Sequence, residues 1–226
     1  MINLQGYGHQ ILLGALMTLK VAFASLTCGL VLGLLGGAAG LSRRLWLRRM
    51  IAGATGLLRG IPEFVILLIC YFGLTGVLYR LTGGDVSISP FAAGVFALSI
   101  VFAAYASEAF RGAFLAVPLG QMEAAAALGL HPGQSFFLVR LPQAWRLALP
   151  SLGNQWQALL KDTSLVSVLG LEDLMRKADV AGQATDQPFT FFLTAAAIYL
   201  LFLTLSNPVI AMLERRSQRG LARVRG

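Results

Sequence analysis

Long apolar stretches dominate the 226-residue chain and limit what it can fold into. They cover about residues 11–39, 62–79, 91–109, 151–169 and 189–212, and ~20 apolar residues are enough for one helix to cross a bilayer. Charged residues make up 12% of the sequence, against roughly 25% in a soluble domain. We therefore predict an all-α integral membrane protein with five transmembrane helices in a single domain, residues 1–226.

The arginines and lysines are distributed unevenly over the loops between these stretches. If the segments after the first, third and fifth spans face the cytoplasm, thirteen cations lie inside, three lie outside and two lie within spans. Cytoplasmic loops carry such an excess of Lys and Arg in membrane proteins. This bias predicts a periplasmic N-terminus and a cytoplasmic C-terminus. It also accounts for the net charge of +8 without a nucleic-acid partner.

Residues suited to catalysis or metal binding are sparse. None of the three lysines, Lys20, Lys161 and Lys177, follows a glycine, so the chain has no phosphate-binding loop of the Gly-Lys-Ser/Thr type. The two histidines, His9 and His131, lie in predicted loops, and His131 is expected to be a solvated surface residue. We predict no catalytic residue, no metal site and no cofactor bound by this chain.

The segment 110–150 is too polar to cross the bilayer and lies on the predicted cytoplasmic side. Pro118 to Leu128 has the composition of a short helix. Gly129 suits the left-handed position that ends such a helix, and Pro132 prevents its continuation. A second helical stretch follows and is expected to break before Pro142. From these residues alone, the segment is either a docking surface for a soluble partner or a hairpin that merely links two spans.

The spacing of this segment resembles the EAA loop of ABC importer permeases. Its anchors are Glu123, Ala124, Ala125, Gly129, Val139, Leu141 and Pro142. In that family the loop is the coupling helix, which sits in a cleft of the ATPase subunit. The resemblance therefore implies that these residues couple the chain to an ATPase. Phe114, Leu115 and Leu128 are expected either to contact that cleft or to pack the loop against its own helices.

Much of the remaining chain is similar to the permeases of polar amino acid importers, above all the histidine and arginine type. The similar stretches are 59–63, 105–112, 153–156 and 160–167. This resemblance implies a type I importer core in a bacterial inner membrane, importing a polar, basic amino acid such as arginine, histidine, lysine, ornithine or a related conjugate. The alternative is an ATP-independent secondary transporter or channel, but no internal repeat of the kind found in secondary transporters is visible.

The same resemblance implies several partners. These are a second permease subunit (a sister chain or a second copy of this chain), two ATPase subunits that bind ATP and Mg, and a periplasmic substrate-binding protein. The chain itself would then be a transport subunit rather than an enzyme.

Polar residues within the fourth span indicate a translocation pathway, because ionisable groups there cost about 2.5–3.5 kcal/mol on insertion scales. The candidates are Asn154, Gln155, Lys161 and Asp162. Asp162 either meets a cationic substrate side chain or pairs with a basic residue of the sister subunit. Lys161 is either a structural ion pair or a ligand for a carboxylate group.

Two further acidic residues lie near helix ends or membrane edges. Glu63 follows Pro62 at the start of the second span, where the helix dipole favours an acid. Capping of that helix and a role in the pathway both remain open for Glu63. Glu108 and Arg111 are three residues apart, and this spacing predicts a local ion pair.

Overall fold

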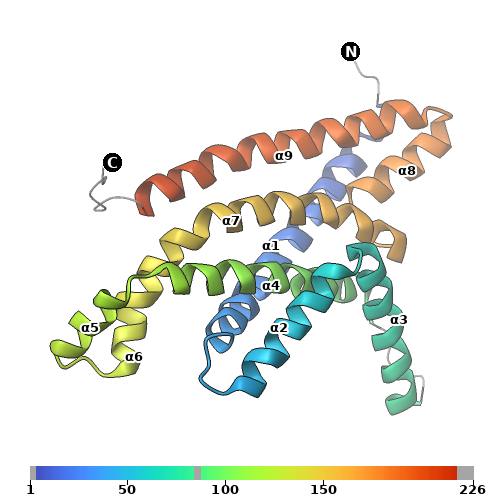
Figure 1. Ribbon diagram of the computed structural model, residues 1–226. Coiled ribbons are helices and arrows are strands. Elements are labelled where there is room, and N and C mark those ends of the chain that lie inside the picture. Colours follow the sequence, from blue (N-terminus) through green and yellow to red (C-terminus); the bar gives the residue numbers. More distant parts are fainter. Residues whose placement is uncertain (1–3, 84–87, 218–226) are drawn as a thin grey trace.

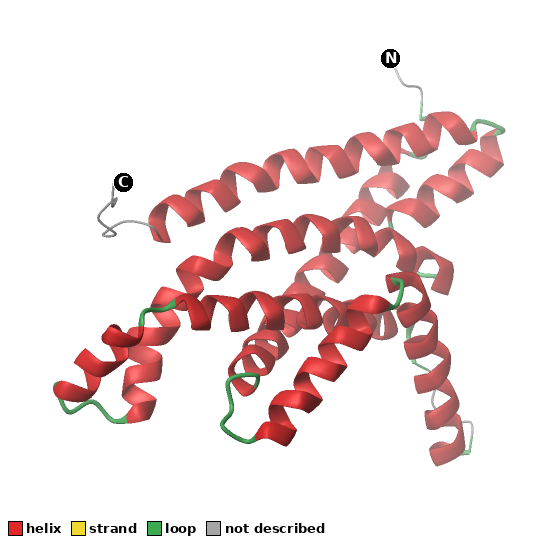
Figure 2. Ribbon diagram, in the orientation of Figure 1, coloured by secondary structure: helices red, strands yellow, loops and turns green. Residues whose placement is uncertain are grey.

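The computed structural model describes residues 4–83 and 88–217, and every regular element within them is a helix (Figure 1, Figure 2). In chain order the elements are α1 (Gly8–Ala39), α2 (Leu45–Gly60), α3 (Glu63–Thr82), α4 (Pro90–Ala116), α5 (Leu119–Ala127), α6 (Pro132–Ser135), the π-helical turn η1 (Phe136–Arg140), α7 (Leu141–Asp162), the 3-10 helix η2 (Thr163–Leu169), α8 (Leu174–Thr185) and α9 (Pro188–Ser217). The polar loop between the second and third predicted spans lies partly outside the described residues, at 84–87, and so do the tail arginines beyond residue 217. The all-α prediction is confirmed.

Helix α4 forms the centre of the bundle, and α1 packs along it (Figure 1). The glycines of α1 let the two backbones approach closely, as small residues do in membrane helices. A Cβ on Gly29 would lie 2.7 Å from Cδ1 of Phe102, and one on Gly37 would lie 2.6 Å from Cβ of Phe110. Helix α7 packs against both α4 and α9. This core holds α4 and α7, the two helices that carry most of the candidate site.

Within residues 4–83 and 88–217, four helices are long and apolar enough to cross a membrane: α1, residues Glu63–Leu81 of α3, α4 and α9. They coincide with the stretches predicted at 11–39, 62–79, 91–109 and 189–212. The fourth predicted span, 151–169, falls on the second half of α7 and on η2, whose polar residues lower the hydropathy. Because α7 lies against α4 and α9, protein shelters part of this polar surface. The count of five spans and the orientation of the termini stay predictions.

A helix stands where a loop was expected, between residues 171 and 188. Asp173 caps the start of α8, because its Oδ1 accepts the backbone N–H of Arg176 at 2.9 Å. Thr18 of α1 accepts the backbone N–H of Leu174 at 3.1 Å and anchors the same end. The residues that α8 buries against α1 and α9 are Leu174, Ala178 and Ala181. The expected loop was wrong because this helical spacing outweighs the polar composition of the segment.

The expected break before Pro142 is also absent. Helix α6 passes through the π-helical turn η1 into α7 without a loop. Pro142 lies in the first turn of α7, where the missing N–H of proline is tolerated, and the widened π-helical turn precedes it. Pro150 is accommodated inside α7. The predicted cytoplasmic segment 110–150 and the predicted fourth span therefore share one continuous helical path.

Candidate functional site

A cavity of about 230 Å³ lies between α3, α4 and α7. Its polar lining side chains are Glu63, Tyr105, Gln155 and Asp162. Its apolar lining side chains are Leu98, Val101, Phe102, Ala158 and Leu159. The cavity thus has two carboxylates in its wall and no basic side chain among its lining residues. Such a site favours a cationic group over a neutral or anionic one.

The start of α3 is tied to the middle of α4 beside this cavity. Glu63 is the first residue of α3, and its Oε1 accepts a hydrogen bond from the hydroxyl of Tyr105 at 3.3 Å. The guanidinium carbon of Arg59 lies 5.5 Å from the centroid of the Tyr105 ring, within the range of a cation–π contact. Glu63 therefore occupies the first turn of its helix and lines the cavity at the same time.

Helix α7 presents one face to the cavity. Gln155, Ala158, Leu159 and Asp162 are spaced three or four residues apart, which places them along one side of an α-helix. Asp162 is the last residue of α7 and is half-buried. Among the described residues, no basic side chain lies within salt-bridge distance of Asp162.

The structure brings together three of the five predicted pathway residues. Glu63, Gln155 and Asp162 line the cavity, whereas Asn154 and Lys161 are exposed and do not belong to its lining. The part of the cavity wall that α4 contributes was not predicted from the sequence. The sequence does contain a pattern that indicates it, because one helix face has a three- and four-residue spacing, with Leu98, Val101, Phe102 and Tyr105. On this otherwise apolar face of the span, the tyrosine provides the polar group that α4 contributes to the cavity wall.

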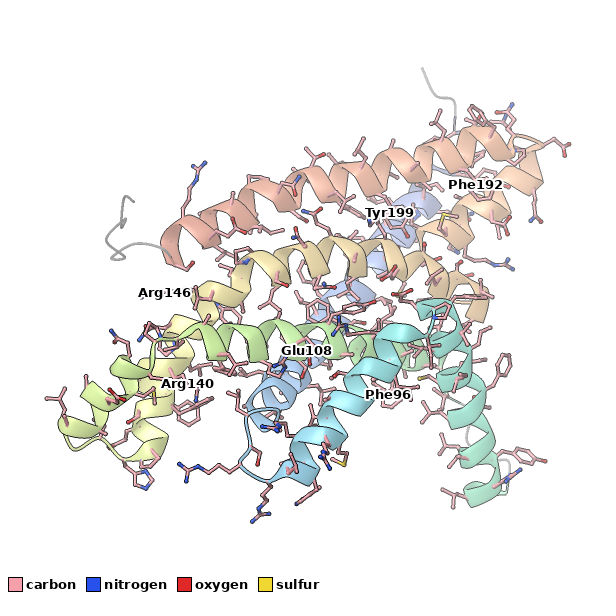
Figure 3. The ribbon with its side chains drawn as sticks, in the orientation of Figure 1. Phe96, Glu108, Arg140, Arg146, Phe192 and Tyr199 are labelled. Carbon is pink, nitrogen blue, oxygen red and sulfur yellow. The ribbon has the colours of Figure 1, made fainter. Side chains whose placement is uncertain are left out.

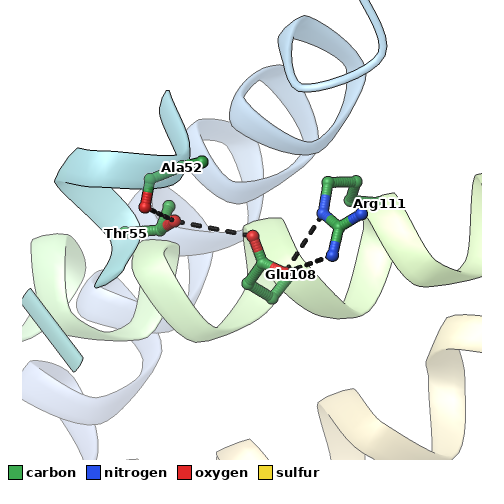
Figure 4. Close-up of polar contacts among 4 residues, drawn as sticks. All are labelled: Ala52, Thr55, Glu108 and Arg111. Carbon is green, nitrogen blue, oxygen red and sulfur yellow. Dashed lines mark hydrogen bonds and ion pairs between the residues drawn. The ribbon is translucent and has the colours of Figure 1, made fainter. Parts of the chain in front are cut away.

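The predicted ion pair between Glu108 and Arg111 is confirmed, and it also reaches α2 (Figure 4). Arg111 Nη2 lies 2.8 Å from Glu108 Oε2, and Nε of the same arginine donates to that oxygen at 3.1 Å. The hydroxyl of Thr55 in α2 lies 3.5 Å from Glu108 Oε1. Both partners lie one to two turns after Tyr105 on α4, toward the end of α4 that leads into α5. Helix α4 therefore contacts α3 at the cavity and α2 below it.

The predicted helix–glycine–helix arrangement of the loop is confirmed in its first half. Helix α5 ends at Ala127, and Gly129 adopts φ +76°, the left-handed conformation expected of it. The N–H of Leu130 then donates to the carbonyl of Ala125 at 3.1 Å, as in a glycine C-cap. His131 is exposed as predicted, and its Nδ1 accepts the N–H of Gly133 at 3.2 Å to cap α6.

The anchor residues of the loop divide between a buried and an exposed side. Ala125 is buried, whereas Glu123 and Ala124 are exposed. Leu141 and Pro142 begin α7 and connect the loop to the cavity helix. The loop therefore presents Glu123 outward while Ala125 packs against the protein.

Large apolar side chains project from the loop. Those that expose between 60% and 82% of their surface are Leu115, Leu119, Leu128, Phe137 and Leu138. Phe114 is fully buried instead, against the rings of Phe110 and Phe136. Phe114, Leu115 and Leu128 were each expected either to contact the ATPase cleft or to pack the loop against its own helices. Phe114 packs the loop, whereas Leu115 and Leu128 face outward. An exposed apolar cluster of this kind is typical of a protein-docking surface.

The loop is also fastened to α4 by Arg140 of η1. Its Nη2 donates to the carbonyl of Phe114 at 3.1 Å, and its guanidinium carbon lies 5.8 Å from the centre of the Phe114 ring. These two contacts therefore connect any displacement of the loop to the end of α4.

A family model of binding-protein-dependent transport system inner membrane components matches residues 29–219. The chain belongs to this family. As an inner-membrane transport component with several apolar spans, the permease is a multi-pass protein of the inner membrane. The localisation expected from the sequence is confirmed.

Curated relatives cover almost the whole permease. The histidine/lysine/arginine/ornithine transport system permease protein HisQ of Escherichia coli K12 is 42% identical over 224 residues, covering 97% of this chain and 98% of the relative. The octopine transport system permease protein OccQ of Agrobacterium tumefaciens (strain Ach5) is 44% identical over 223 residues, covering 96% and 94%. The arginine ABC transporter permease protein ArtQ of Haemophilus influenzae is 46% identical over 205 residues, covering 91% and 92%.

Solved structures share the fold of the permease. A crystal structure of an amino acid ABC transporter with histidines matches with a TM-score of 0.80 at 34% identity, covering 93% of this chain and 95% of that one. The inward-facing MetNI methionine ABC transporter matches with a TM-score of 0.74 at 20% identity, covering 92% and 96%, which shows the fold alone. The resemblance to permeases of amino acid ABC importers is thereby confirmed. These relatives favour an ATP-driven importer over an ATP-independent transporter.

Proposed function

We propose that this permease forms the translocation path for a basic amino acid in an ATP-driven importer. Glu63 and Asp162 would meet the guanidinium or ammonium group of the substrate inside the cavity. The observation that carries this proposal is the pair of carboxylates in one cavity wall, with no basic side chain among the residues that line the cavity. The relatives named for arginine, for octopine and for histidine, lysine and ornithine support a cationic substrate.

The proposal includes the topology expected from the sequence. Five spans with a periplasmic N-terminus place α5 and α6 in the cytoplasm, which agrees with thirteen cations on that side and three on the other. The exposed leucines of the loop would then fit a cleft in an ATPase subunit. The residues proposed for this coupling are Glu123, Ala124, Ala125, Gly129, Leu141 and Pro142.

Further subunits complete the proposed importer. Two ATPases would bind ATP and Mg, and a periplasmic binding protein would deliver the substrate. A sister permease would face this chain across the pathway, with a second copy of this chain as the alternative. Lys161, exposed beside Asp162, would pair with a carboxylate of that partner or of the substrate.

Arginine uptake into proteoliposomes that contain the assembled importer tests the cavity. We expect Asp162→Asn and Glu63→Gln each to lower uptake about tenfold or more, because each removes a charge-assisted partner of the substrate cation. Asn154→Ala is the matched control, since Asn154 precedes a lining residue but lies outside the cavity. Basal ATPase activity and subunit stoichiometry are measured on the same samples.

Two results would contradict the proposal for Asp162. Unchanged arginine uptake by an assembled Asp162→Asn importer would remove the carboxylate from substrate binding. Loss of the sister permease from the purified Asp162→Asn complex would assign Asp162 to the subunit interface.

A further inference from the structure

A second and larger cavity, a groove of about 520 Å³, lies between α1, α7 and α9. It shares no lining residue with the carboxylate cavity. Its wall is apolar apart from Ser206 and the indole N–H groups of Trp145 and Trp156, and Trp156 Nε1 donates to Ser206 Oγ at 3.0 Å. The volume falls within the range of about 300–1,000 Å³ typical of ligand pockets. The proposed transport mechanism gives this groove no role.

The groove is narrow at its middle and opens toward the end of α9. A Cβ on Gly153 would lie 2.7 Å from Cγ2 of Ile210, so α7 and α9 are in close contact there. Gln157 donates to Asn207 at 3.0 Å and holds the helices together one turn further along. From this level α7 and α9 diverge toward the C-terminal end of α9 (Figure 1). Pro150 and Pro208 lie inside the two helices near the point of divergence.

Arginines stand at the open end of the groove on both helices. Arg146 lies one turn before Leu149, on the face of α7 that Leu149 and Gly153 continue into the groove (Figure 3). Arg216 lies one turn after Leu213, which is the last groove residue of α9. Arg216 also lines a separate cavity of about 450 Å³ on α9, together with Arg215.

These arginines are not neutralised within the described part of the chain. No carboxylate there lies within salt-bridge distance of Arg146, Arg215 or Arg216. Glu214 is the acidic residue beside them in α9. Three guanidinium groups and one carboxylate leave a positive excess at the mouth of an apolar groove.

We propose that this groove binds an anionic phospholipid, with an acyl chain between α7 and α9 and the phosphate at Arg146 and Arg216. On the topology proposed above, the lipid belongs to the cytoplasmic leaflet. Basic pockets between transmembrane helices on that side suit acidic headgroups. An apolar helix of another subunit would fill the groove but would leave the arginines without anions. The charge at the groove mouth therefore favours a lipid over a protein segment.

Lipid retention by the assembled importer tests this proposal. The complex is reconstituted in nanodiscs with equal amounts of phosphatidylglycerol and phosphatidylcholine and extracted again in mild detergent, and the retained lipids are quantified by mass spectrometry. We expect the wild-type importer to be enriched in phosphatidylglycerol. A variant with Arg146→Gln and Arg216→Gln should lose roughly fivefold in enrichment per arginine, the effect of one cation near an anionic lipid.

A variant with Arg43→Gln and Arg44→Gln is the control, because these exposed arginines lie in the α1–α2 connection, away from the groove. Equal phosphatidylglycerol enrichment in both double variants would overturn the proposal and indicate ordinary annular lipid. A photo-cross-linker at Leu213 should react with lipid, and its reaction with a second permease subunit would assign the groove to a protein interface instead. If the double variant does not assemble, Arg216→Gln alone, at the exposed end of α9, gives the same comparison.

Discussion

Among the residues of this permease, the carboxylates that are half-buried or buried are the ones on which burial imposes the strongest physical constraint. Glu63 accepts the Tyr105 hydroxyl, and Asp162 lines the same cavity without a basic partner among the described residues. Asp173, between the last two predicted spans, is 1% exposed, and its Oδ2 has no hydrogen-bond partner among the described residues. A buried carboxylate of this kind disfavours its charged form.

Asp173 should make the stability of the importer depend on pH. Burial raises the pKa of Asp173 to about 6, above the ordinary value of about 3.9. Because the folded state binds the proton more tightly, its stability relative to a neutral variant falls as the pH rises from about 4 to about 6, then stays level. Asp173→Asn keeps the helix cap and removes the charge. The variant should therefore be more stable at pH 8, by about 3 kcal/mol at most, and equal near pH 4.

The check is the thermal unfolding midpoint of the detergent-purified complex between pH 4 and pH 8, compared between wild type and Asp173→Asn. A difference between them that is the same at every pH would show that Asp173 does not titrate in this range.

Gly129 is the residue on which the shape of the coupling loop depends. Its φ of +76° strains any β-branched residue, although no atom lies within 4 Å of an added Cβ. We expect Gly129→Val to cost about 1–2 kcal/mol locally and to reduce uptake per ATP hydrolysed. Gly129→Asn, which tolerates this conformation, should keep most of the coupling. Equal uptake-to-hydrolysis ratios in the two variants would remove Gly129 from the coupling role.

At the scale of helices, α1 and α4 form the tightest pair of the bundle. Gly29, Gly33 and Gly37 recur every fourth residue on the face of α1 that meets α4. Their spacing is visible in the sequence and is typical of close helix contact in membranes, yet this pairing was not predicted. It places α4 firmly enough to support Tyr105 and Glu108 at defined positions.

Gly33→Val should therefore destabilise the permease. A Cβ at Gly33 lies against Cβ of Ala106, and the carbonyl oxygen of Ala103 is 3.3 Å away, so the helices must separate. We expect a loss of about 1–3 kcal/mol or more, measured as a lower unfolding midpoint. Gly73→Val in α3 is the control, because among the described residues no atom outside the neighbouring backbone of α3 lies within 4 Å of a Cβ there. Equal effects of the two substitutions would mean that the α1–α4 contact is not tight.

The elements that the sequence predicted well are those with a single strong signal. Apolar length located α1, α3, α4 and α9, and Gly129 located the end of α5. The elements it missed combine opposing signals. Helix α8 is polar in composition yet helical in spacing, and α7 contains Pro142 and Pro150. At the site, the charges of Glu63 and Asp162 were visible, but Tyr105 joins them only through the packing of α4 beside α3.

Across the whole molecule, α4 connects the carboxylate cavity to the loop of α5 and α6, for which we propose the coupling role. Tyr105 contacts Glu63 at the cavity, Glu108 contacts Thr55 of α2, and the carbonyl of Phe114 accepts a hydrogen bond from Arg140 of the loop. Helix α7 forms a second connection, because it begins at the loop with Leu141 and ends at the cavity with Asp162. A movement of the loop therefore reaches two walls of the cavity through continuous helices.

We propose that an ATPase acts on the cavity through this loop, and the ATPase activity that co-purifies with the permease tests this directly. The tagged permease is purified in mild detergent from its own cells, and vanadate-sensitive ATPase activity is measured in the eluate. We expect such activity in the wild type and a loss of roughly tenfold or more in Glu123→Arg, which places a cation on the exposed side of the proposed docking surface. A folded permease that purifies without ATPase activity, or a Glu123→Arg complex with normal activity, would show that no ATPase docks on this loop.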